Sequence, residues 1–127
     1  MVFAFLKFNP KFLNKWDIDG GNYNGYVAFD ADLYPATGDD LIYDELSNKI
    51  DVHGGVTFND TMDCFKDTPL LPLTNLPDIN ELFTKKYRVI GFDTMHAYDT
   101  ENNCSISFMK EETMRMYDQV VELIYNK

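Results

Sequence analysis

Short apolar segments, separated by turn residues, recur along most of the chain. They are rich in β-branched and aromatic residues, which favour strands, and most are too short for a stable helix. We predict strands over residues 2–8, 25–30, 48–54, 55–60, 87–96 and 104–109. No helical pattern recurs between each pair of these segments, so a doubly wound parallel sheet is a poor fit.

Helical spacing is clearest at the C-terminal end, over residues 111–126. Tyr117, Val120, Val121 and Ile124 recur there at three- and four-residue intervals. A shorter helix is predicted over 77–87, with an acid near its start and two lysines near its end, as the helix dipole favours. We therefore predict an α+β fold, a mainly antiparallel sheet with the C-terminal helix packed on one face, as a single domain over residues 1–127.

The segments between these elements are polar or broken by proline. Residues 30–48 carry six acids and are predicted to form a solvated loop, with at most a helical turn at 39–47. Residues 61–77 contain three prolines and are predicted to be irregular. Residues 17–25 have the composition of a turn, and a helical turn is predicted after Pro10.

Charge narrows the classes of partner. The chain has 21 acidic and 11 basic residues and a net charge of -10, which opposes direct binding of nucleic acid or anionic membranes. Two interpretations stay open: an ordinary acidic protein, or an acidic surface that docks on a basic host protein. The N-terminal segment lacks the pattern of a signal peptide and no apolar run reaches membrane-spanning length, so we expect a cytoplasmic protein that does not enter membranes.

Neither the cysteines nor the common sequence motifs identify a cofactor. Cys64 and Cys104 are far apart in the sequence and form no cysteine–histidine cluster, so a zinc site is not expected. We interpret both as reduced thiols, and a single disulfide between them is the alternative. The chain also lacks the dinucleotide, P-loop and nucleophile-elbow motifs.

One of the two histidines, His53, stands directly before Gly54 and Gly55. Glycines inside a strand pattern mark a bulge or a close approach of the backbone to a ligand, and a bulge would redirect the histidine side chain. The backbone amides of the two glycines could then face an anion such as a nucleotide phosphate. The alternative is a glycine-rich turn with His53 on the surface.

The second histidine, His96, lies midway between Asp93 and Asp99 in a three-residue spacing. On a helical turn all three would share a face, whereas on a strand the histidine would point the other way. Imidazole with carboxylate can serve as a metal-ligand set or as an acid–base pair. The alternative is a polar loop whose histidine bonds a neighbouring aspartate.

Three phrases together, NGYVAF (24–29), DVHGGVTF (51–58) and VIGFDTMHAYD (89–99), resemble a family of small phage and bacterial proteins. The resemblance runs from about residue 24 to the end. It implies a site, but no activity, at the motif positions Asn24, Gly25, Tyr26, His53, Gly54, Gly55, Thr57, Gly91, Asp93, His96 and Asp99. The chain departs from the family at residues 30–40, which replace a histidine-containing segment, and before Gly91, where tryptophans are expected. The first departure puts a three-histidine metal centre in doubt.

Three functions are compatible with these features. The first is a phage-type accessory protein with a pocket for a small ligand such as a nucleotide, which could sequester a host signalling molecule. There His53, Asp93 and His96 would line the pocket, and binding would also involve Asn24, Tyr26, Gly54, Gly55, Thr57 and Asp99. The second is a metal-dependent or acid–base hydrolase that uses both histidines with Asp93 and Asp99. The third is an acidic protein that inhibits a basic host partner.

Overall fold

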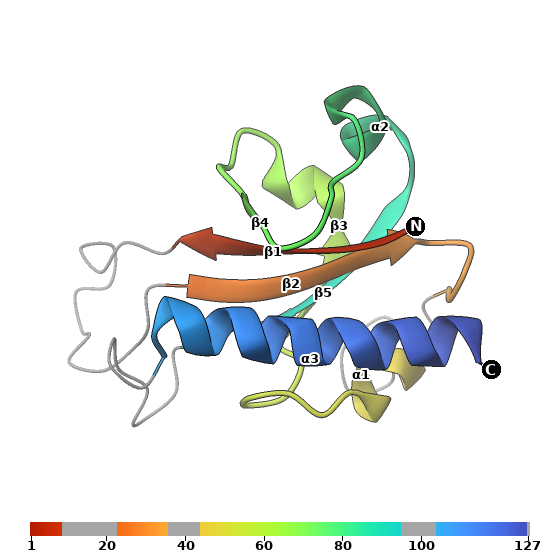
Figure 1. Ribbon diagram of the computed structural model, residues 1–127. Coiled ribbons are helices and arrows are strands. Elements are labelled where there is room, and N and C mark those ends of the chain that lie inside the picture. The colour runs from red at the N-terminus through yellow and green to blue at the C-terminus, as the bar shows by residue number, and fades with distance from the viewer. Residues whose placement is uncertain (9–22, 36–43, 95–103, 127) are drawn as a thin grey trace.

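The computed structural model describes residues 1–8, 23–35, 44–94 and 104–126. Five antiparallel strands form one sheet in the order β3-β5-β2-β1-β4, and a long C-terminal helix runs along one face of it (Figure 1). The strands are β1 (Val2–Phe8), β2 (Tyr23–Asp30), β3 (Phe58–Thr61), β4 (Leu71–Pro72) and β5 (Tyr87–Phe92). The helices are α1 (Glu45–Lys49), the 3-10 turn η2 (Met62–Phe65), α2 (Ile79–Thr84) and α3 (Ile106–Tyr125). The predicted α+β class is confirmed.

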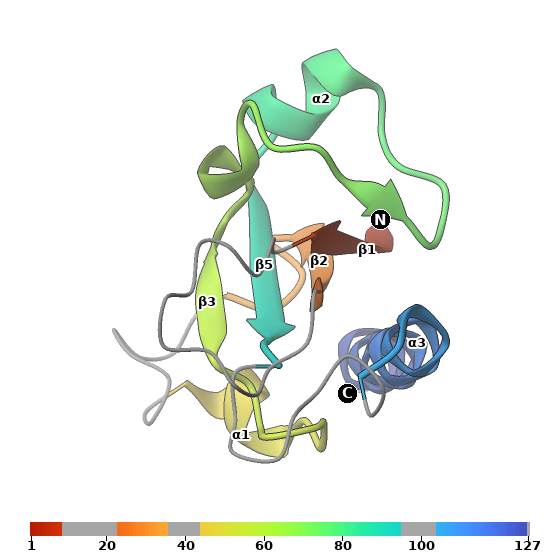
Figure 2. The ribbon, with the colours of Figure 1, turned by 90° about the vertical axis from the view of Figure 1, so that its left-hand side faces the viewer.

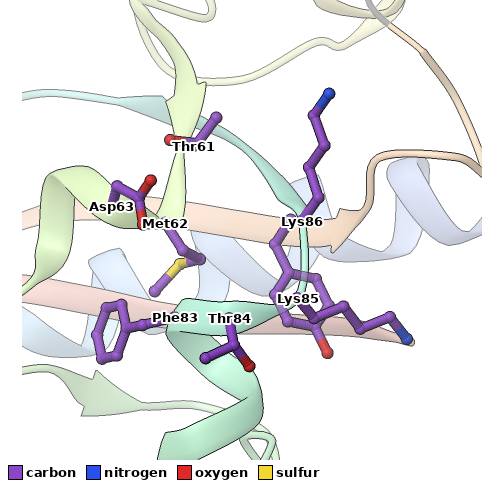
Figure 3. A pocket seen from close by; sticks show the side chains of 8 residues that line it. Thr61, Met62, Asp63, Phe83, Thr84, Lys85 and Lys86 are labelled. Carbon is purple, nitrogen blue, oxygen red and sulfur yellow. The ribbon is translucent and has the colours of Figure 1, made fainter.

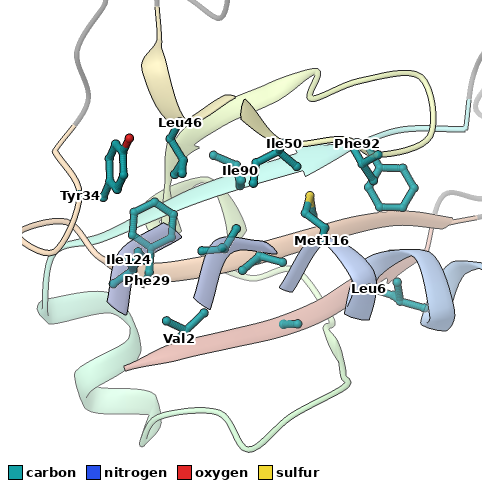
Figure 4. Close-up of a cluster of buried hydrophobic side chains, with 14 of the residues drawn as sticks. Val2, Leu6, Phe29, Tyr34, Leu46, Ile50, Ile90, Phe92, Met116 and Ile124 are labelled. Carbon is teal, nitrogen blue, oxygen red and sulfur yellow. The ribbon is translucent and has the colours of Figure 1, made fainter. Parts of the chain in front are cut away.

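The three central strands, β1, β2 and β5, carry most of the core because both faces of each are covered. Their register places Val27 between Ala4 and Ile90, and all three side chains are fully buried. On one face, Phe29 and its neighbours pack under α3 (Figure 4), whose buried residue Met116 lies in the same cluster. The opposite face is covered by η2 and α2 and holds a second cluster.

Two glycines let neighbouring groups approach the central strands closely. A Cβ atom on Gly25 would lie 2.2 Å from Thr113 Oγ1 of α3 and 2.6 Å from the Phe92 ring. A Cβ atom on Gly91 would lie 2.4 Å from the ring of Tyr26, on the opposite face. Gly25 and Gly91, two of the four glycines in the family-like phrases, are therefore required by packing, whatever they contribute to a ligand site.

Two predicted strands are wrong. Residues 48–54 form no strand because α1 continues to Lys49 and the chain then enters a turn. Residues 104–109 form no strand because the side chain of Ser105 accepts a hydrogen bond from the Phe108 amide and caps α3. Helix formation from Ile106 buries Met109 against the sheet, which a strand here would not do.

Other predicted elements are confirmed with shifted bounds. The strands at 2–8 and 25–30 are present, and the second begins earlier, at Tyr23. The segment 55–60 pairs only from Phe58, and the strand at 87–96 ends at Phe92. The helix at 77–87 is shorter than predicted, with Asp78 as its cap, and the helix at 111–126 begins five residues earlier. The helical turn predicted after Pro10 lies outside the described residues, as do residues 17–22 of the predicted turn.

The acidic segment 30–48 is not wholly a solvated loop. Asp44 is fully buried, where it caps α1 by accepting hydrogen bonds from the Ser47 amide at 2.9 Å and hydroxyl at 2.7 Å. Asp30 is ion-paired with Lys85 at 3.0 Å. An acidic docking surface would therefore lack these two carboxylates. Within the described ranges, no helix is both long and apolar enough to cross a membrane.

Candidate functional site

The three family-like phrases meet at one end of the sheet. In the strand register, Gly25 lies opposite Phe92 and Gly91 is flanked by Tyr26 and Phe58. The amide of Thr57 donates to the Gly91 carbonyl at 2.9 Å, which ties the 51–58 phrase to the same place. Figure 2 shows β5 between β3 and β2. The predicted site residues on these segments are Asn24, Tyr26, His53, Gly54, Gly55, Thr57 and Asp93. His96 and Asp99 lie outside the described residues.

His53 occupies a tight turn rather than a strand bulge. The Gly55 amide donates to the Val52 carbonyl at 2.8 Å, and Gly54 and Gly55 have φ of 69° and 80°. Positive φ after His53 is that of a type II turn, which requires glycine at this position. The turn of the alternative is therefore confirmed, but His53 is half-buried and does not stand on the surface as that alternative had it. The Gly55 amide already donates to Val52. Of the two glycine amides, only that of Gly54 could therefore donate a hydrogen bond to a bound anion.

A carboxylate on α3 fastens this turn to the helix. Glu112 Oε2 accepts from the His53 amide at 2.7 Å, while Arg115 binds the same carboxylate through two nitrogens at 2.8 and 2.9 Å. Gln119 exchanges two further hydrogen bonds, each 2.7 Å long, with the backbone of Asp51. The Arg115 hydrogen bonds hold the pKa of Glu112 below its usual value, and this outweighs the opposing effect of burial. The His53 turn is therefore held at several points.

The imidazole of His53 lies on the face of the sheet that α3 covers. Its ring makes edge contacts with Phe108 at a centroid distance of 5.4 Å and with Phe92 at 6.4 Å. Tyr26 belongs instead to the cluster on the opposite face. There burial raises the pKa of Tyr26, and the nearby Asp93 carboxylate adds to the increase. The predicted residues thus occupy two neighbourhoods at one end of the sheet, one on each face.

Asn24 and Tyr26 form a polar pair beside aromatic rings. Asn24 Nδ2 donates to the Tyr26 hydroxyl at 3.2 Å, and Asn24 Oδ1 is buried with no hydrogen-bond partner among the described residues. The Tyr26 ring contacts three phenylalanines, Phe5, Phe58 and Phe65, at centroid distances of 5.4, 5.3 and 4.7 Å. Tyr26 is therefore a core residue. Its hydroxyl lies beside Asn24, whose Oδ1 is an acceptor without a donor among the described residues.

Sequence reasoning missed a buried ion pair. Arg88 in β5 pairs with Asp44 and also donates to the Tyr34 carbonyl at 3.0 Å and to Asn59 at 3.1 Å. The signal was available: a single arginine inside an otherwise apolar strand must find a buried partner, because an unpaired charge there is too costly. The sequence did not indicate which acid that would be.

No group of three metal-binding side chains occurs within residues 1–8, 23–35, 44–94 and 104–126. The metal-dependent alternative thus depends on residues outside these ranges. In comparisons with known proteins, no family model, no curated protein and no solved structure matches the chain.

Proposed function

We propose that the protein binds a small organic ligand at the end of the sheet where β2, β5 and the His53 turn meet. The observation that supports this most is the buried Asn24 Oδ1, which has no partner among the described residues. Buried polar atoms in native proteins are nearly always hydrogen-bonded, so a lone acceptor of this kind indicates a missing donor. A ligand donor that reached Asn24 would supply it.

A nucleobase is the ligand class that fits this pair best. The oxygen of Tyr26 already accepts from Asn24, so its hydroxyl proton can be donated, while Asn24 Oδ1 can accept. Nucleobase edges present adjacent donors and acceptors that match such a pair. The net charge of -10 opposes multiply charged ligands. We therefore expect nucleosides and monophosphates to bind more tightly than triphosphates.

The same proposal makes this a binding protein of the phage accessory type that works in the cytoplasm and withholds its ligand from other proteins. The phage accessory type is suggested by the resemblance of the three phrases to phage and bacterial proteins. The withholding of a ligand is suggested by the proposed nucleobase class.

Calorimetry with a panel of nucleosides and nucleotides tests the proposal. For a ligand that binds, Asn24→Ala should weaken affinity by about 5- to 100-fold, the range for losing one buried hydrogen bond. Asn75→Ala, at an exposed position on another part of the chain, is the matched control and should leave affinity unchanged. Absence of heat with the whole panel, or equal binding by Asn24→Ala, would show that the proposal is wrong.

A further inference from the structure

A hollow lies away from the sheet end just described. It encloses about 290 Å³ between η2, the end of α2 and the start of β5 (Figure 3). Its lining includes Met62 and Tyr87, which are buried, and Phe83, which is half-buried. This volume is at the lower end for ligand pockets and suits a small metabolite with an apolar part.

Two opposite charges stand at different sides of this hollow. Asp63 belongs to η2, and Lys86 directly precedes β5 (Figure 3). In the described part of the chain, neither side chain has an ion-pair partner, so the two are too far apart to pair with each other. The neighbouring Lys85 differs, because it is bound by Asp30 at 3.0 Å and Glu81 at 3.7 Å.

We propose that this hollow binds a zwitterion, specifically a free α-amino acid with an apolar side chain. The carboxylate of the ligand would pair with Lys86, whose flexible stem can bring the ammonium over the opening, and its ammonium would pair with Asp63. The apolar side chain would pack on Met62 and Phe83. A ligand of zero net charge is not repelled by the acidic protein. This inference uses none of the residues of the proposed nucleobase site and does not rest on it.

Titration of ¹⁵N-labelled protein with leucine, methionine and phenylalanine, followed by amide chemical shifts, tests the inference. We expect saturable shifts at Thr61, Thr84 and Lys86. Asp63→Asn and Lys86→Gln should each weaken binding by about 10-fold, as for the loss of one charged contact. The matched controls Asp67→Asn and Lys66→Gln change the same charges on exposed residues outside the lining, and should leave affinity within about twofold.

Derivatives of the amino acid separate the two contacts. N-acetylation removes the ammonium and amidation removes the carboxylate, so both derivatives should bind much more weakly than the parent. Equal binding by either derivative, shifts confined to Asn24 and His53, or no saturable shift with any amino acid would each overturn the inference.

Discussion

At the scale of single residues, the most consequential interaction joins Arg88 to Asp44. Asp44 is fully buried, Arg88 is 5% exposed, and the guanidinium also lies 5.6 Å from the centre of the Phe29 ring. Burial opposes the charged form of Asp44, but hydrogen bonds from Ser47 and Arg88 outweigh it and lower the pKa of this carboxyl. A single buried pair therefore fastens the segment before α1 to β5.

Neutralising Asp44 should destabilise the protein strongly. Asp44→Asn retains a side chain that can cap α1, but leaves the buried Arg88 without its counter-charge. We expect the free energy of unfolding in urea to fall by about 3–5 kcal/mol. Asp32→Asn, at an exposed position, is the control and should change it by less than about 0.5 kcal/mol. A loss below about 1 kcal/mol for Asp44→Asn would contradict a stabilising role for the pair.

At the scale of elements, α3 packs closely on β2. The buried residues of α3 are Met109, Thr113, Met116, Val120 and Ile124, which recur at helical spacing along one side. Gly25 is the position on β2 where no Cβ can be accommodated, because Thr113 and the Phe92 ring fill the space. The helix can therefore lie this close to the sheet only if residue 25 has no side chain.

A methyl group at this position should separate the two elements. We expect Gly25→Ala to lower the free energy of unfolding by about 1–3 kcal/mol through overpacking, although glycine-to-alanine changes in strands are otherwise favourable. Thr113→Ala removes the nearest atom, so the double variant should recover part of the loss. Urea unfolding measures this stability. If Gly25→Ala were as stable as the unaltered protein, the backbone around residue 25 would be able to shift and accommodate the methyl group.

At the scale of the whole molecule, charge has two opposing effects on stability. The net charge of -10 at neutral pH makes the compact state repel itself. Lowering the pH toward the sequence pI of about 4.4 relieves that repulsion. The carboxyls of Asp44 and Glu112, in contrast, are stabilising while ionised, since both have a lowered pKa in the folded protein.

We therefore expect maximal stability near pH 5 and a decline below about pH 4. A carboxyl with a lowered folded pKa contributes fully above its unfolded pKa, and that contribution is lost as the pH falls through the folded value. Urea unfolding between about pH 7 and pH 3 measures the profile, and Glu112→Gln should reduce the slope of its acid side. Glu111→Gln, at the exposed neighbouring position, should keep the slope. Continued stabilisation below about pH 4 would contradict this account.

The candidate site was predictable in part. Asn24, His53 and Asp93 lie in the three phrases that together resemble one family. That resemblance predicted that these residues belong to one site. The sequence did not show that His53 and Tyr26 lie on opposite faces, because that depends on which face each segment presents when the sheet forms. A glycine-rich turn after His53 was one of two alternatives, and the deciding hydrogen bond from Gly55 to Val52 is a property of the folded backbone.

The sequence by itself determined the α+β class, the strands at 2–8 and 25–30 and most of α3. These follow from local periodicity, which records which side of an element is buried. Only the tertiary structure decided that Glu112 holds a turn 59 residues away and that Arg88 pairs with an acid 44 residues away. Partners so distant along the chain leave no periodic signal, since what joins them is the packing of separate elements.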